Sequence, residues 1–183
     1  MNLLDACVLS ALLLSASAVH ADQNDARLED LFERLQNANN LTEAAPVEEL
    51  IWQVWTEHAD SSANRLMLTG IEQMSANALP AALDTFKRLI ADQPDFAEAW
   101  NKRATIHFLM GNYEASEADI VKTLQLEPFH FGALSGRGLV LLSQQQFEEA
   151  RNAFSRALEV HPNMPSVRNN IDEINRYLRG STI

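Results

Sequence analysis

The stretch Trp100–His130, WNKRATIHFLMGNYEASEADIVKTLQLEPFH, carries a pattern that returns on both sides of it. It opens with a large aromatic residue, has an alanine four residues later, Gly-Asn-Tyr in its middle and a proline near its end. Prolines follow one another at a spacing of 34 residues, at Pro94, Pro128 and Pro162. A constant period of this length is typical of repeat architectures, in which one supersecondary unit stacks on the next.

Three windows on this period, 63–96, 97–130 and 131–164, agree column by column. Large apolar, small and bulky residues each return at a fixed place. The aligned columns are Leu66/Trp100/Leu134, Gly70/Ala104/Gly138, Leu79/Tyr113/Phe147, Ala82/Ser116/Ala150 and Phe86/Ile120/Phe154. Small residues are expected where two antiparallel helices cross closely, and a proline ends a helix because it lacks an N–H. Each window therefore predicts a hairpin of two helices.

The turn between the two helices of a window also has a pattern. Gly111 lies just past the first helix of its window, where glycine adopts a left-handed backbone at little cost. Asn77 holds the same place one window earlier, and asparagine is the next best residue there. Pro80 falls in the first turn of the following helix, where proline is tolerated.

These columns resemble the tetratricopeptide repeat (TPR), and the resemblance covers 63–164, more than half of the chain. It implies an all-α fold, a right-handed α-solenoid of TPR helix hairpins. The departures are local: His107 stands where the family often has a tyrosine, and a column that is usually leucine holds Thr69, Arg103 and Arg137. The blocks WNKRAT and EPFHFGALSGRG (127–138) also resemble small bacterial TPR proteins whose activity is unsettled, which supports the fold more than a function.

Both flanks of the array show helical periodicity. In 22–62, two amphipathic helices are predicted, the second over about 42–58, with apolar positions at Leu28, Leu31, Phe32, Leu35, Val47, Leu50, Ile51, Val54 and Trp55. We interpret this pair as a degenerate repeat that covers the N-terminal end of the array. In 165–183, a capping helix and tail are predicted, with a stripe of Val167, Ile171, Ile174, Tyr177 and Leu178, because the last repeat exposes an apolar face.

The first residues, 1–21, have the character of a signal peptide. Cys7–Val19 is uncharged and apolar or small, and small residues before Ala18 and Ala21 suit cleavage after either. We therefore expect a periplasmic or secreted protein with no membrane contact after cleavage. The segment before Cys7 holds Asp5 and no Lys or Arg, so a misassigned start or an uncleaved anchor is the alternative, and a cytoplasmic location with it. Cys7 is the only cysteine, so a cleaved chain could form no disulfide.

The formal net charge of −11 argues against nucleic acid or an anionic membrane as the main partner, because both are polyanions. No arrangement of residues predicts catalysis, a metal or a cofactor. The histidines follow no ligand spacing, and we expect solvated or helix-ending positions for His20, His58, His130 and His161. His107 is expected to line the core, hydrogen-bonded to a neighbour, with a groove-side or pH-sensitive contact as the alternative.

In the TPR family, the first helices of the repeats line a concave face that binds extended peptides or a partner helix. The resemblance places there Asn64, Met67, Ile71, Met74, Glu98, Asn101, Lys102, Thr105, Phe108, Leu109, Gly132, Ser135, Leu139 and Leu142. Methionines offer adaptable apolar contacts, and the side chain of Asn101 can hold a peptide backbone. Lys102, Arg103 and Arg137 could attract a carboxylate or pair with Glu98 or Glu117.

Some TPR proteins hold a C-terminal carboxylate with a fixed set of Lys and Asn residues. That set is incomplete in this sequence, because Met67 and Ser135 occupy the places equivalent to Asn101. We therefore predict no chaperone-tail site. The sequence predicts a non-catalytic protein–protein interaction module that binds a protein or peptide, in an envelope assembly. The alternative is a structural subunit that forms a homo-oligomer or docks permanently through its ends, through Trp52 and Trp55, or through its convex face.

Overall fold

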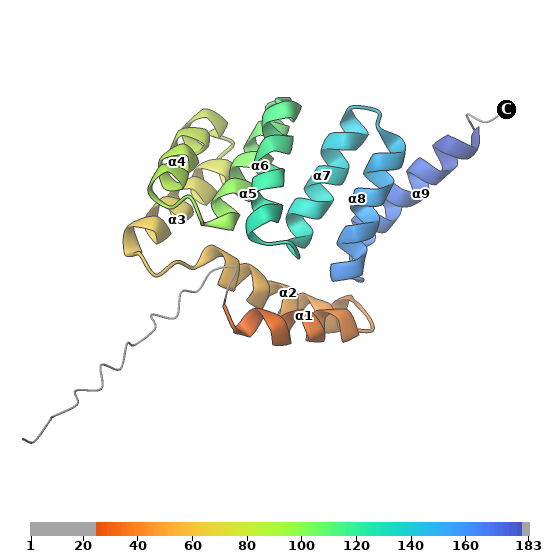
Figure 1. Cartoon of the computed structure of the whole chain (residues 1–183), viewed down its shortest axis with the longest axis horizontal. Helices are drawn as coiled ribbons and strands as arrows, with labels where there is room; N and C mark the ends of the chain where they lie inside the picture. The colour runs from red at the N-terminus through yellow and green to blue at the C-terminus, as the bar shows by residue number, and fades with distance from the viewer. Residues whose placement is uncertain (1–24, 181–183) are drawn as a thin grey trace, which may run out of the picture.

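The structure, a computed structural model, describes residues 25–180. The predicted signal peptide and the residues of the tail after Gly180 lie outside the described part. Within 25–180 there are nine α-helices and no strand: α1 Arg27–Asn37, α2 Leu41–Thr56, α3 Ser61–Ser75, α4 Leu79–Asp92, α5 Ala97–Leu109, α6 Tyr113–Leu126, α7 Phe131–Ser143, α8 Phe147–Val160 and α9 Pro165–Gly180 (Figure 1). No helix among these residues has the length and apolar character needed to cross a bilayer.

Three helical hairpins, α3–α4, α5–α6 and α7–α8, lie side by side and α9 follows at the far end (Figure 1). The predicted all-α, solenoid-like fold is confirmed. The first helices of the hairpins, α3, α5 and α7, contact one another in sequence along the array. We call the surface that they form the first-helix face.

The small-residue columns set how closely the two helices of a hairpin approach. A Cβ on Gly70 would lie 2.5 Å from the ring of Phe86, and a Cβ on Gly138 would lie 2.4 Å from the ring of Phe154. In the middle hairpin, the Ser116 hydroxyl donates a hydrogen bond to the carbonyl of Ala104 at 2.8 Å. The glycines therefore make room for the rings that form the hairpin cores.

The hairpin turns require a left-handed residue at the same place in all three repeats. Asn77 (φ 55°) and Gly111 (φ 76°) adopt this conformation, as the sequence predicts. The third turn uses Gln145 (φ 61°), which no residue preference indicates. The carbonyl groups at the end of α7 accept hydrogen bonds from the backbone N–H groups of the turn. These hydrogen bonds hold Gln145 in place.

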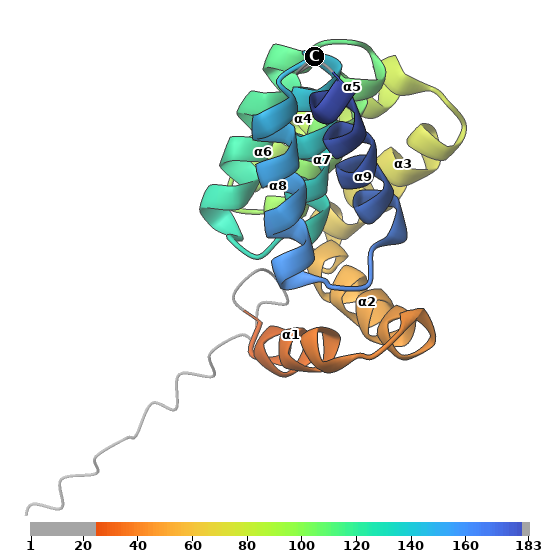
Figure 2. The ribbon, with the colours of Figure 1, turned by 90° about the vertical axis from the view of Figure 1, so that its right-hand side faces the viewer.

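The N-terminal pair α1–α2 does not cover the first hairpin, so that prediction is wrong. The pair lies beneath the array, across the edge where each second helix turns into the next first helix (Figures 1 and 2). α1 contacts α8 and α2 contacts α5. One apolar core joins residues of α1 and α2 with residues of α7, α8 and α9, so the pair binds the second half of the array.

Aromatic packing explains this position of α2. The Trp55 ring stacks on His130 with ring centroids 3.9 Å apart, and it lies 5.0 Å from the Phe131 ring. Trp52 lies against the start of α7, where a Cβ on Gly132 would be only 2.7 Å from its ring. The two tryptophans therefore find aromatic partners at the α6–α7 turn.

Polar contacts fasten the other end of the pair. Nδ2 of Asn163 donates to the carbonyl of Ala38 at 2.7 Å, and Nε2 of His161 lies 3.2 Å from the carboxylate of Glu48. At the far end of the array, α9 packs on α8 and buries Val167 and Ile174. The third hairpin is thus covered by the α1–α2 pair at the end where α8 leads into α9, and by α9 along α8.

Candidate peptide-binding site

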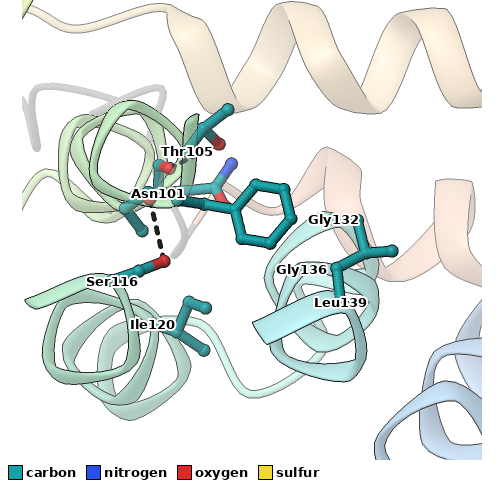
Figure 3. A pocket seen from close by; sticks show the side chains of 9 residues that line it. Asn101, Thr105, Ser116, Ile120, Gly132, Gly136 and Leu139 are labelled. Atoms are coloured by element: carbon teal, nitrogen blue, oxygen red, sulfur yellow. Dashed lines mark hydrogen bonds between the residues drawn. The ribbon is translucent and has the colours of Figure 1, made fainter. Parts of the chain in front are cut away.

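A pocket opens between α5, α6 and α7 (Figure 3), and we call it the Asn101 pocket. It is lined by Asn101, Ala104, Thr105, Phe108, Ser116, Ile120, Gly132, Gly136 and Leu139. Its volume is about 70 Å³. Sites for whole small molecules occupy roughly 300–1,000 Å³, so this pocket has room for a single side chain.

The pocket exists because α7 has no side chain at Gly136. A Cβ placed there would meet only Cδ1 of Ile120, at 3.9 Å, so the space beside it is open. The space beside Gly132 is not open, because the ring of Trp52 occupies the place where a side chain would lie. Leu139, 37% exposed, lies one turn further along α7 at the rim.

Asn101 presents a fixed amide to the pocket. Its Nδ2 donates to Oε2 of Glu98 at 2.8 Å, and a carboxylate can accept only from the NH₂ side of the amide. The carbonyl oxygen Oδ1 therefore faces another way, and no described residue donates a hydrogen bond to it. Thr105, its neighbour on the pocket wall, donates its hydroxyl to the backbone carbonyl of Asn101 at 3.0 Å.

Glu98 is fully buried, and its carboxylate lies within 2.8 Å of three side-chain nitrogen atoms. Besides Asn101, Nε2 of His130 lies 2.8 Å from Oε2, and Nζ of Lys102 lies 2.8 Å from Oε1 as an ion pair outside hydrogen-bond geometry. Burial by itself raises the pKa of Glu98, but the charge of Lys102 and the hydrogen bond from His130 outweigh burial and lower the pKa to about 2. Glu98 is therefore ionised at neutral pH, which fixes the amide of Asn101.

His130 has a defined tautomer. It is the N-cap of α7, where its Nδ1 accepts the N–H of Ala133 at 3.1 Å. The proton must then be on Nε2, which donates to Glu98. With Trp55 stacked on its ring, His130 connects α2, α5 and α7 at one buried point.

The cations of α5 and α7 all have acidic partners within the chain. Arg103 makes two hydrogen bonds to Asp119, of 2.8 and 2.7 Å, and its guanidinium lies 4.8 Å from the Trp100 ring centre. Nε of Arg137 donates to Glu117 at 2.8 Å, and Lys102 pairs with Glu98. The predicted Arg137–Glu117 and Lys102–Glu98 pairs are present, and these cations are engaged with acids of the chain.

Comparison with known proteins identifies the family. Two sequence models described as Tetratricopeptide repeat match residues 68–129 and 131–164. A TPR repeat-containing protein of Rhizobium etli is 34% identical over 155 residues, which are 85% of this chain and 76% of that protein. The chain is a tetratricopeptide repeat protein.

Other TPR proteins share part of the chain or its fold. DnaJ homolog subfamily C member 3 of Homo sapiens is 32% identical over 93 residues, 51% of this TPR protein and 18% of that one. The solved first TPR of Spaghetti (RPAP3), bound to HSP90 peptide SRMEEVD, superposes with a TM-score of 0.63 at 25% identity, covering 66% of this chain and 96% of that one. The Yersinia enterocolitica type III secretion chaperone SycD has a TM-score of 0.61 at 14% identity, covering 65% and 96%, and shows the fold alone.

The TPR fold brings some predicted groove residues together at the Asn101 pocket, namely Asn101, Thr105, Phe108, Gly132 and Leu139. Two predictions are wrong. Met67 is 0% exposed inside the core of the first hairpin, and Glu98 is buried under Lys102 and His130. Position along the repeat indicates which side of a helix a residue is on, but the side-chain length and partners decide whether it reaches solvent.

The remaining predicted residues lie elsewhere on the TPR array. Asn64 bonds both the N–H and the carbonyl of His58 in the α2–α3 connection, at 2.8 and 2.6 Å. The hydroxyl of Ser135 donates to the carbonyl of Gly132 at 3.0 Å. The others are half-buried against the hairpin cores or exposed beyond the pocket: Ile71, Met74 and Leu142 in the first group and Leu109 in the second.

The histidines also require correction. His130 and His161 cap the ends of α7 and α8, so the helix-ending alternative holds for them, but both are buried and bonded to acids, so the solvated alternative is wrong. His58 follows the end of α2 and lies in the connection to α3. Burial lowers the pKa of His107, and its Nε2 is 3.9 Å from Asp119, too far for the hydrogen bond that was predicted. Within 25–180, no group of three His, Cys, Asp or Glu side chains forms a metal site.

Four residues of the Asn101 pocket are absent from the predicted set: Ala104, Ser116, Ile120 and Gly136. Ser116 and Ile120 belong to the second helix of the repeat, behind the first-helix face (Figure 3). A glycine inside a helix, such as Gly136, costs about 1 kcal/mol relative to alanine and so indicates a packing or functional reason. That cost is the signal in the sequence from which this pocket could have been inferred.

Proposed function

We propose that this TPR protein is a non-catalytic interaction module in which an extended segment of another polypeptide lies on the first-helix face. One side chain of that segment enters the Asn101 pocket. The observation that carries this proposal is the fixed amide of Asn101 beside an open apolar space. Oδ1 of Asn101 has no donor within the described chain, and a peptide N–H supplies one.

The relatives support an interaction role. The first TPR of Spaghetti (RPAP3), 25% identical, was solved with a peptide bound. A pocket of about 70 Å³ suits one residue of such a peptide and excludes a cofactor-sized ligand. The pattern of 1–21 supports export as part of this proposal, so that the partner is a protein of the cell envelope and the role is assembly or maintenance of an envelope complex.

The structure also bears on the alternative of a self-associating subunit. One form of that alternative uses Trp52 and Trp55 as the association surface, besides the ends of the array and its convex face. Trp55 is buried under His130 and Phe131, and Trp52 packs against Gly132 of the same chain. The two tryptophans are used within the protomer, which argues against association through them and supports the peptide-binding function.

In-cell photocrosslinking tests the proposal. A photoreactive residue at Leu139, on the rim of the Asn101 pocket, should capture a specific polypeptide. Gly136→Val introduces a branched side chain into the pocket, where a Cβ would meet only Cδ1 of Ile120, at 3.9 Å. Gly180→Val is the matched control, because a Cβ at Gly180 meets nothing within 4 Å and the residue lies at the end of α9.

The expected result is capture in the unmodified and Gly180→Val proteins and its loss in Gly136→Val, with all three showing the same circular dichroism. Equal capture by Gly136→Val would show that the pocket does not hold the partner.

A further inference from the structure

We propose that the Asn101 pocket takes a small aliphatic side chain from within a polypeptide segment, and that it does not bind an acidic C-terminal tail. This inference rests on the proposed function and names the chemistry of its ligand. Three observations lead to it: the charges around the pocket, the shape of its apolar wall and the single free acceptor of Asn101.

The charges disfavour a carboxylate in or near the pocket. None of the nine lining residues is charged. The three cations of the flanking helices α5 and α7 are engaged, Lys102 by Glu98, Arg103 by Asp119 and Arg137 by Glu117. On α6, Lys122 lies 6.0 Å from the ring of Trp100 and is not part of the wall. A ligand carboxylate would lose its hydration without gaining a cation, which is strongly unfavourable.

A buried negative charge lies directly behind the wall. The carboxylate of Glu98 contacts Asn101 at 2.8 Å, and its low pKa, about 2, keeps it ionised at neutral pH. Lys102 balances that charge, and its ammonium also lies 5.1 Å from the Trp52 ring centre. A ligand carboxylate could recruit Lys102 only by breaking this buried pair. The chain as a whole has a net charge of −11, so longer-range attraction also favours a neutral or basic segment.

The wall of the pocket fits an aliphatic group. Ala104, Phe108, Ile120 and Leu139 supply apolar surface, and the open volume of about 70 Å³ is filled by a valine-sized or leucine-sized side chain. Shape and polarity thus select a branched aliphatic side chain.

Oδ1 of Asn101 adds a requirement for a backbone donor. The other polar side chains of the wall already donate to backbone carbonyls, the Ser116 hydroxyl to Ala104 at 2.8 Å and the Thr105 hydroxyl to Asn101 at 3.0 Å. The acceptor on Asn101 is therefore matched by a main-chain N–H of the bound segment. Every non-proline residue offers such an N–H, but a terminal residue also brings a carboxylate, for which the pocket wall has no cation. The pocket thus fits an internal valine or leucine in an extended segment.

Two sets of peptides test this inference on the purified full chain. The first is a phage-displayed library of random 12-residue peptides, selected against the protein with Gly136→Val as the counter-selection. The second is the synthetic peptide SRMEEVD with a free carboxylate, and the same peptide with a C-terminal amide. Isothermal titration measures the individual affinities, and Gly180→Val serves as the folded control.

We expect selected peptides with a central Val or Leu and few acidic residues, and no measurable binding of SRMEEVD. Val→Ala in the selected peptide should weaken binding about tenfold, because it removes the burial of two methyl groups. Binding of SRMEEVD that is lost on amidation and in Asn101→Ala would overturn the inference and leave the proposed function intact. If neither set binds, the proposed function fails, and the inference fails with it.

Discussion

The carboxylate of Glu98 and the imidazole of His130 lie 2.8 Å apart, and neither side chain has any exposed surface. This contact joins α5 to the N-terminus of α7, and the ring of Trp55 on α2 stacks on the far side of His130. Asn101 hydrogen-bonds the same carboxylate oxygen. The position of the N-terminal helix pair and the orientation of the pocket amide thus depend on one buried cluster.

Removal of the Glu98 charge should destabilise the protein strongly. Glu98→Gln leaves Lys102 without its buried partner, and loss of one member of a buried pair typically costs about 3–5 kcal/mol. Urea unfolding measures the change in free energy. Glu117→Gln is the control, because the Glu117–Arg137 pair is partly exposed and should contribute about 1 kcal/mol or less. Equal losses in the two variants would mean that burial does not strengthen the Glu98 cluster.

Acid should remove the contribution of Glu98 to the free energy of unfolding over a defined pH range. Its folded-state pKa is about 2 and its ordinary value is 4.5, so the stabilisation is complete above 4.5 and is lost as the pH falls toward 2. Glu127 should affect stability in the opposite direction as the pH falls. Burial raises its pKa, so its protonation favours the folded state. Urea unfolding from pH 5 to pH 2 should therefore show a steeper loss in the unmodified protein than in Glu98→Gln. Parallel curves would contradict this assignment.

Alanine substitution at Gly136 and at Gly138, both in α7, should change the free energy of unfolding in opposite directions. Gly138→Ala places a Cβ 2.4 Å from the Phe154 ring and should lower the free energy of unfolding by about 1–3 kcal/mol. Gly136→Ala meets only open space and should raise it by up to about 1 kcal/mol, through helix propensity. Chemical denaturation of both variants tests the geometry of the pocket without a ligand. A loss of stability in Gly136→Ala would show that the space beside it is already filled.

Trp55 should control the docking of α1–α2. Trp55→Ala removes a buried ring from the core shared by α2 and α7, at a cost of about 3–5 kcal/mol. Without its stacking partner, His130 should release the N–H of Ala133, so hydrogen exchange at Ala133 should become faster while α3–α4 keeps its protection. Leu50→Ala is the control on the same helix, because Leu50 is 40% exposed. Unchanged exchange at Ala133 would rule out this coupling.

The repeat could be predicted from the sequence because its determinants are local. A 34-residue period, small residues at helix crossings and turn residues such as Asn77 and Gly111 each act within one hairpin. The placement of α1–α2 could not be predicted in the same way. An amphipathic pattern shows that a helix buries one face, but it does not show against which surface, and Trp52 and Trp55 meet residues almost 80 positions away.

The candidate site was predicted only in part for a related reason. Asn101, Thr105 and Phe108 follow from their position on the first helix of a repeat. The burial of Glu98 and His130 does not, because each depends on the other, 32 residues apart, and neither belongs to a recognisable motif. Charged and ionisable side chains are usually exposed, so their burial here is decided by partners that only the fold brings together.

The central claim, that a polypeptide segment binds at the Asn101 pocket, is tested most directly by NMR titration of the labelled protein with a selected peptide. We expect saturable shifts of the Gly136 amide and the Asn101 side-chain NH₂ in the unmodified protein, and no shift of the Asn101 NH₂ in Gly136→Val. Saturable shifts confined to residues outside the pocket, with the signals of Gly136 and Asn101 unmoved, would contradict it.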